Sequence, residues 1–116
     1  MRSLVLALTI ILLLTSCNDD DKEDTVLVFK YKSSVQCAPD SGILLDDMAA
    51  DLTAANIKVL CAADGHDGNV AITLCGAETG EINVYEITKS ALINAENLGF
   101  SNLSALQDAN VVMACQ

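Results

Sequence analysis

The chain has 116 residues, of which 52% are hydrophobic, and it carries 16 acidic against six basic side chains. The resulting formal charge of −10 argues against nucleic acid as a partner, because phosphate groups repel an acidic surface. Aromatic residues make up only 3% of the chain and tryptophan is absent, which disfavours carbohydrate-stacking sites and aromatic-rich interfaces.

Residues 1–16 have the pattern of a secretory signal peptide. Arg2 precedes an apolar run from Leu4 to Leu14, and two small polar residues then lead to Cys17. This run is about half as long as the roughly twenty residues that a helix needs to cross a bilayer. A removable signal is therefore predicted here, and not a membrane span.

The tetrapeptide Leu14-Thr15-Ser16-Cys17 resembles the lipobox of bacterial lipoproteins. The resemblance implies cleavage before Cys17, a diacylglyceryl thioether on its sulfur and a fatty acyl group such as palmitate on the new amino terminus. Membrane attachment would then run through this lipid. In that family, Asp directly after the cysteine marks retention at the inner membrane, so Asn18 favours the outer membrane. The alternative is a plain secretory signal in which Cys17 keeps an ordinary thiol.

Residues 17–24 follow as an acidic tether. Asn18 to Asp24 contains no apolar residue and cannot pack, so it is expected to be solvated. Residues 25–116 are then long enough for one small domain.

The first half of this domain predicts a strand, a helix and a second strand. Residues 25–32 are rich in β-branched and aromatic side chains, which indicates a strand. Pro39 stands just before Asp40 and Ser41, either of which can cap a helix that ends at Asn56. The helix is predicted by apolar residues at helical spacing, namely Ile43, Leu44, Met48, Leu52 and Ala55. Residues 57–61 begin the second strand.

The second half starts with an expected loop over residues 62–68. Residues 70–75 are predicted as a short strand, 76–80 as a turn, and 81–87 as a strictly alternating strand. On that strand we expect Ile82, Val84 and Ile87 to face inward. A second helix follows a cap at Thr88 or Ser90, carries Leu92, Ala95 and Leu98 on its apolar face, and stops at Gly99. Residues 103–106 predict one further helical turn, and 111–115 an edge strand or a clasp.

This order predicts a ferredoxin-like α+β sandwich of the βαββαβ type, with two helices on one face of a mostly antiparallel sheet. If residues 70–75 pair with 82–87, the sheet gains an additional hairpin.

Four cysteines remain when Cys17 is assigned to lipid: Cys37, Cys61, Cys75 and Cys115. An even number in a small exported domain indicates two disulfides, and neither zinc ligation nor a redox site has the expected Cys-x-x-Cys spacing. We expect the pairs Cys61–Cys75 and Cys37–Cys115, with Cys37–Cys75 as the alternative.

The segment Asp64-Gly65-His66-Asp67-Gly68-Asn69 is the cluster that most invites a chemical interpretation. It lacks the ligand spacing of a calcium loop, and an ordinary polar turn is the simpler interpretation. Asp46, Asp47 and Asp51 fall on the polar face of the predicted helix, where they are expected to be solvated. No catalytic residue, metal site or cofactor is therefore predicted, and the chain is not expected to be an enzyme.

The leading hypothesis is a membrane-anchored envelope lipoprotein whose domain binds another protein or stabilises an assembly. A second hypothesis is a small-ligand or metal-ion binder that uses loop 64–69. A third is an inhibitor of a periplasmic hydrolase, with the exposed segment 62–80 as the inhibitory loop.

Overall fold

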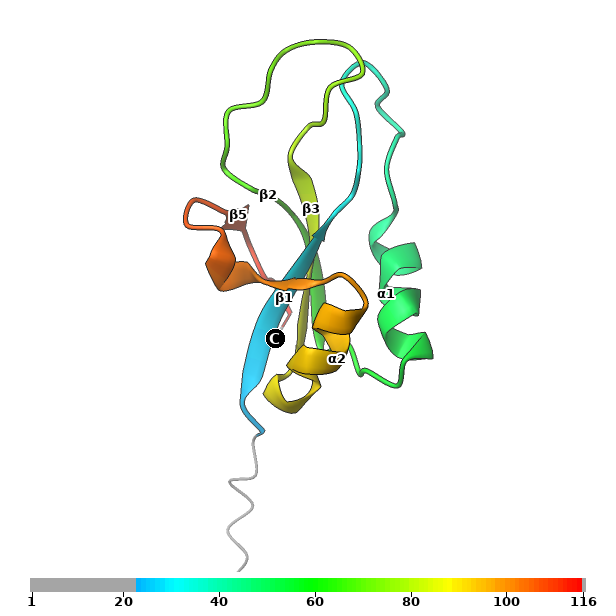
Figure 1. Ribbon diagram of the computed structural model, residues 1–116, viewed down its shortest axis with the longest axis vertical. Coiled ribbons are helices and arrows are strands. Elements are labelled where there is room, and N and C mark those ends of the chain that lie inside the picture. The colour runs from blue at the N-terminus through cyan, green and yellow to red at the C-terminus, as the bar shows by residue number, and fades with distance from the viewer. Residues whose placement is uncertain (1–22, 116) are drawn as a thin grey trace, which may run out of the picture.

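The centre of the structure is the antiparallel strand β3 (Glu81–Thr88), which pairs with β1 (Thr25–Tyr31) on one side and β2 (Cys61–His66) on the other. The computed structural model describes residues 23–115. Two-residue strands, β4 (Ser101–Asn102) and β5 (Asn110–Val111), complete a five-stranded antiparallel sheet in the order β4-β1-β3-β2-β5 (Figure 1). None of the helices in residues 23–115 has the length and apolar character needed to cross a membrane.

Two helices cover one face of this sheet. Helix α1 (Leu45–Ala54) connects β1 to β2, and α2 (Leu92–Asn97) follows β3 after the 3₁₀ turn η1 (Lys89–Ala91). Their buried side chains form one cluster with sheet residues, which comprises Val28, Met48, Leu52, Ile57, Tyr85, Ile87, Ala95 and Phe100. The expected α+β class with two helices on one sheet face is therefore confirmed.

Both helices end as their sequences predict. Asn56 and Gly99 have positive φ angles of 62° and 94°. In each case the following amide reaches back five residues: Ile57 N–H donates to the carbonyl of Leu52 at 3.0 Å, and Phe100 N–H to that of Ala95 at 3.1 Å. These are Schellman motifs, which need a left-handed residue at the stop.

The start of α1 differs from the prediction. The helix begins at Leu45 after Leu44, which makes no side-chain cap, so neither Asp40 nor Ser41 caps it. The Ser41 hydroxyl instead accepts a hydrogen bond from Val35 N–H at 2.8 Å and donates to the carbonyl of Ala38 at 2.7 Å. Because its hydroxyl is bonded within the preceding turn, Ser41 does not cap the helix.

The second face of the sheet is also buried, which corrects the expectation for β3. Ile82 and Val84 point to the opposite face from Ile87, because successive side chains of a strand alternate. They pack with Phe29 against the C-terminal part of the chain, which contains the 3₁₀ turn η2 (Leu103–Ala105), and Leu106, Val111 and Met113 close this face.

The second strand also lies elsewhere than predicted. The strand was expected to start over residues 57–61 and a loop to follow over 62–68, but β2 occupies residues 61–66 and residues 57–60 precede it. Gly65 makes this possible, because a Cβ there would lie 2.5 Å from the side chain of Val111 on the neighbouring β5. Residues 70–75 form no strand, so the additional hairpin is absent. At the C-terminus, Asn110–Val111 is the strand, and Cys115 acts as the clasp.

Candidate functional site: the apolar loop between β2 and β3

The feature of the molecule that most suggests a binding role is the segment Asn69–Leu74, called here the apolar loop. It leaves β2 after His66 and returns toward β3 at Cys75, and it lies at the top of the molecule in Figure 1. Val70, Ile72 and Leu74 are 99%, 75% and 63% exposed. The alternation that predicted a strand here is real, but no neighbouring strand covers these side chains.

The first end of the loop is held by Asp67, whose side chain is buried. Its Oδ2 accepts a hydrogen bond from the Tyr31 hydroxyl at 3.1 Å, and its Oδ1 accepts one from Asn69 N–H at 2.9 Å. Its own N–H donates to the carbonyl of Gly80 at 3.0 Å. Asp67 therefore joins the end of β1, the beginning of the loop and the beginning of β3.

These hydrogen bonds determine the charge of Asp67. Burial by itself raises the pKa of this carboxyl, but the hydrogen bonds from Asn69 and Tyr31 outweigh burial and hold the pKa below its ordinary value. Burial, followed by the same contact with Asp67, raises the pKa of Tyr31. Asp67 is thus an ionised carboxylate whose hydrogen-bond partners belong to the scaffold.

His66 is also committed to the scaffold. Its Nδ1 accepts a hydrogen bond from Gly68 N–H at 2.9 Å, which places the ring proton of the neutral form on Nε2. That nitrogen donates to the carbonyl of Thr79 at 2.8 Å. Both ring nitrogens are used, so His66 is available neither as a free base nor as a metal ligand.

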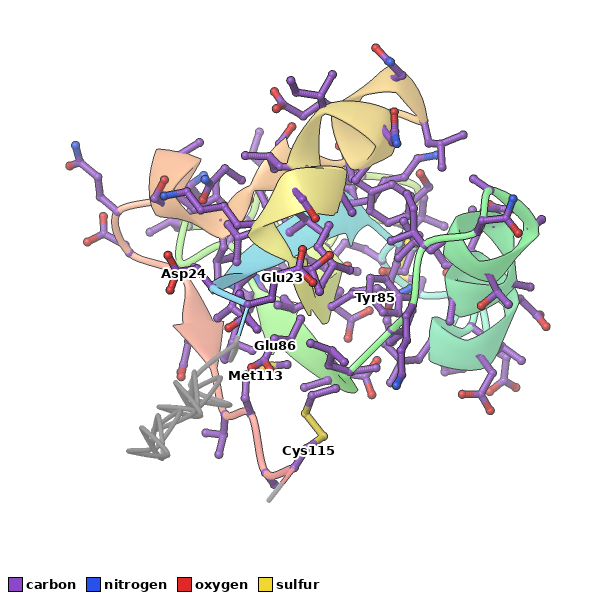
Figure 2. The ribbon with its side chains drawn as sticks, turned by 90° about the horizontal axis from the view of Figure 1, so that it is seen from below. Glu23, Asp24, Tyr85, Glu86, Met113 and Cys115 are labelled. Atoms are coloured by element: carbon purple, nitrogen blue, oxygen red, sulfur yellow. A yellow bond between two sulfur atoms is a disulfide. The ribbon has the colours of Figure 1, made fainter. Side chains whose placement is uncertain are left out.

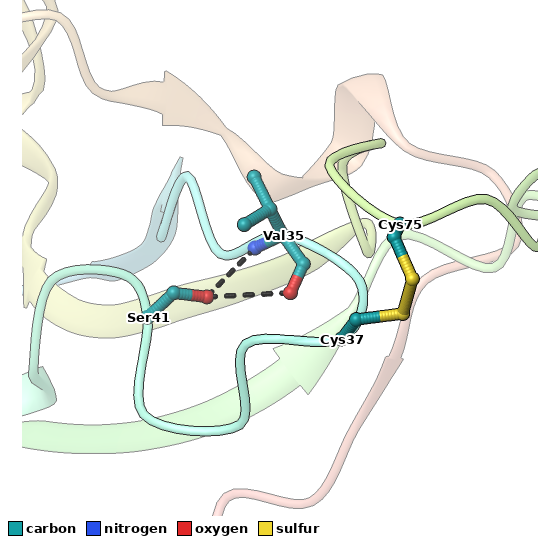
Figure 3. Close-up of a disulfide and its surroundings, with 4 residues drawn as sticks. All are labelled: Val35, Cys37, Ser41 and Cys75. Carbon is teal, nitrogen blue, oxygen red and sulfur yellow. Dashed lines mark hydrogen bonds between the residues drawn. A yellow bond between two sulfur atoms is a disulfide. The ribbon is translucent and has the colours of Figure 1, made fainter.

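The second end of the loop is held by the disulfide Cys37–Cys75, whose Cα atoms are 5.1 Å apart (Figure 3). Backbone pairing continues from β1 and β3 up to this bridge: Gln36 N–H donates to the carbonyl of Ala77 at 2.8 Å, and Gly76 N–H to that of Gln36 at 3.1 Å. Ser41 fixes the adjacent turn through its contacts with Val35 (Figure 3). The second end of the loop is therefore joined to two hydrogen-bonded backbone segments, one following β1 and one preceding β3.

An open pocket of about 480 Å³ lies beneath the apolar loop. Its walls combine the scaffold residues Tyr31 and Asp67 with the loop residues Val70 and Ile72 and the exposed Glu78. A group of polar side chains stands next to it, where the Ser34 hydroxyl donates to Oε2 of Glu81 at 2.6 Å. Apolar side chains of the loop and polar side chains of the scaffold therefore meet in this pocket.

The structure corrects the expected disulfide pairing. The four cysteines form Cys37–Cys75, which was the alternative, and Cys61–Cys115, whose Cα atoms are 5.6 Å apart. The pairs Cys61–Cys75 and Cys37–Cys115 do not occur. Cys61 starts β2 and Cys75 lies beyond its far end, so the length of the strand separates them.

The remaining predicted residues lie apart from the loop. Asp46, Asp47 and Asp51 are exposed on α1, as expected. Within residues 23–115, no group of three or more His, Cys, Asp or Glu side chains is arranged to hold a metal ion. Cys17, the predicted lipid attachment point, lies outside the described residues.

Sequence reasoning missed the Tyr31–Asp67 contact, because 36 residues separate the partners. It also placed residues 70–75 in the sheet. The uncharged, β-forming hexapeptide 70–75 favours a strand, and no local pattern marks it as an exposed loop. No family model, curated protein or solved structure matches this chain.

Proposed function

We propose that this protein is a lipid-anchored envelope lipoprotein that binds another protein through the apolar loop. The observation that carries this proposal is the exposure of Val70, Ile72 and Leu74 on a segment that is fixed at both ends. Adjacent apolar side chains left in water are costly, and such groups mark interaction sites. Holding both ends reduces the conformational entropy that the loop loses on binding.

The position of the loop supports a partner located away from the membrane. The lipid tether would join the domain just before β1, at Glu23 and Asp24, which are labelled in the view from below in Figure 2. β1 begins at the lower end of the molecule in Figure 1. β1 and its continuation then run to Cys37, next to the apolar loop. Seven residues of strand alone separate the two ends by roughly 20 Å.

The location in the cell envelope rests on two observations. The residues around Cys17 resemble a lipobox, and two disulfides are typical of exported proteins because the bacterial cytosol keeps thiols reduced. Asn18 after the cysteine favours the outer membrane. No enzymatic activity is part of this proposal, since the polar side chains around the loop serve the scaffold.

We further infer that the domain is a ferredoxin-like sandwich. Its strands β1 to β4 are arranged in the order β4-β1-β3-β2, with α1 and α2 in the two crossover connections, and this arrangement supports that assignment. β5 is then an addition at the β2 edge that covers the second face together with η2.

Site-specific photo-crosslinking in intact cells tests the binding proposal. A photoreactive residue replaces Val70 in one strain and Ile93 in a second, because Ile93 is 71% exposed on α2, outside the loop. We expect one discrete adduct from position 70 only. Ile72→Asp should abolish this adduct, whereas Ile93→Asp should not.

Equal labelling at both positions, or an adduct that survives Ile72→Asp, would contradict the proposal. Globomycin-sensitive processing and mass spectrometry of the mature amino terminus test the anchor separately. An unmodified Met1 on the isolated protein would contradict lipidation.

A further inference from the structure

We propose that the apolar loop enters the substrate cleft of an endopeptidase with apolar subsites and inhibits it by binding as a slowly cleaved peptide. This inference rests on the proposed function, since it gives the class of protein that the same loop would bind. Three observations carry it: the free backbone of the loop, its fixed ends, and its uncharged alternating sequence.

The backbone of the loop is available to a partner. Within the described residues, no intramolecular hydrogen bond engages the N–H groups of Val70, Ala71, Ile72 or Thr73. Unpaired backbone amides next to alternating side chains are what an extended peptide offers when it pairs with a partner's strand. Peptidase clefts read substrates in this manner, through main-chain hydrogen bonds and pockets for alternate side chains.

Both ends of the loop are anchored, so a cleaved loop would not leave the cleft as the product of an ordinary substrate does. Hydrolysis of one peptide bond in the loop would consume one water and leave a new carboxylate and a new amine. The Asp67 network would hold the first fragment in place, and Cys37–Cys75 would hold the second. The two new ends would stay near each other, so that release is slow and the cleft remains occupied.

The sequence of the loop indicates which class of peptidase could bind it. Residues 69–77 contain no charged side chain, so peptidases that cleave beside basic or acidic residues find no site in the loop. Val70 and Ile72 lie two residues apart in the segment whose amides are free and fit neighbouring apolar pockets, whereas Leu74 N–H turns back to the carbonyl of Ile72 at 2.9 Å. The acidic surface of the chain, with a formal charge of −10, favours a cleft with a basic rim and speeds the encounter.

A bilayer is the less favourable occupant. The loop lies at the opposite end of the sheet from the start of β1, where the tether would join, and an acidic domain is repelled by anionic headgroups. A protein cleft satisfies both the backbone and the apolar side chains, whereas lipid would leave the free N–H groups unpaired.

Inhibition assays with purified enzymes test the proposal. The full-length chain, purified in detergent, is titrated into subtilisin, elastase and thermolysin, which all accept apolar residues. Trypsin is the control, because no Lys or Arg occurs between Lys58 and Lys89. We expect competitive inhibition of at least one of the three at micromolar or lower concentration, and none of trypsin.

Variants then locate the effect. Ile72→Asp should weaken inhibition at least tenfold, whereas Ile93→Asp should leave it unchanged. Releasing one end of the loop, by Cys37→Ser with Cys75→Ser, should turn the inhibitor into a substrate that is cut at least tenfold faster between residues 69 and 75. Tyr31→Phe loosens the other end without removing a disulfide, and it should act in the same direction if the double serine variant fails to fold.

Absence of inhibition across the three enzymes, or rapid cleavage of the intact loop without inhibition, would overturn this inference. A crosslinked partner in cells combined with either result leaves the proposed function in place and removes only the peptidase assignment. Inhibition in vitro without any adduct at position 70 would instead remove the proposed cellular role.

Discussion

The hydroxyl of Tyr31 donates a hydrogen bond to Oδ2 of Asp67 over 3.1 Å, and this contact joins the end of β1 to the first residue after β2. Because Asp67 also accepts a hydrogen bond from Asn69, one buried carboxylate fixes the path by which the chain enters the apolar loop. The disulfide Cys37–Cys75 fixes the path by which it leaves. The exposed apolar residues are thus presented by a rigid support.

The ionised form of Asp67 should make stability depend on pH. Its pKa is lower in the folded state than its ordinary value of 3.8, so its stabilising contribution is present above that value and is lost as the pH falls through the folded-state pKa. Asp67→Asn should therefore destabilise the protein by about 1–3 kcal/mol at pH 7. Urea unfolding at pH 7, 4, 3 and 2 should show the difference shrinking below pH 4; a constant difference would refute this role.

Two glycines with similar backbone angles should respond differently to alanine. Gly68 and Gly76 have φ angles of 83° and 89°, but a Cβ at Gly68 would overlap the backbone carbonyl of Asp108, whereas one at Gly76 meets nothing within 4 Å. Gly76→Ala should cost about 1–2 kcal/mol from the left-handed backbone alone. Gly68→Ala adds the overlap, for roughly 3–5 kcal/mol. Thermal unfolding of both variants checks this, and equal losses would contradict the close approach.

The two disulfides should have separable roles. Replacing either pair with serine should lower the free energy of unfolding by about 2–5 kcal/mol, because each bridge restricts the unfolded chain. Only the loss of Cys37–Cys75 should expose residues 69–75 to rapid limited proteolysis. Mass mapping of the fragments identifies the cut, and the Cys61–Cys115 variant serves as the matched control. Equal loop cleavage in both variants would show that the bridge does not hold the loop.

Tyr85 provides a test of the core under the helices. It is fully buried, and its hydroxyl donates to the carbonyl of Leu45 at 2.6 Å, which ties β3 to the first residue of α1. Burial raises the pKa of Tyr85, so the neutral donor persists across the physiological range. Tyr85→Phe should cost about 1–3 kcal/mol by leaving that carbonyl with one partner fewer. Denaturant unfolding measures the loss, and hydrogen exchange should localise it to the start of α1.

The sequence was most informative where structure follows from local chemistry. The β-branched run at residues 25–32 predicted β1, and Asn56 and Gly99 marked the ends of the helices because the left-handed stop depends on a single residue. The even cysteine count predicted two disulfides. The exposed carboxylates of α1 also followed from helical periodicity.

Tertiary contacts decided the rest. Cys61–His66 contains Ala, Asp and Gly and has little tendency to form a strand by itself, yet β3 and β5 pair with it from both sides. Residues 70–74 have a strong tendency to form a strand, yet they remain in solvent. Cys37–Cys75 and Asp67 hold both ends of this segment away from any strand edge. The pairing of the cysteines and the hydrogen bond between Tyr31 and Asp67 join residues that are far apart in the chain. The local sequence pattern does not encode which of these residues meet in space.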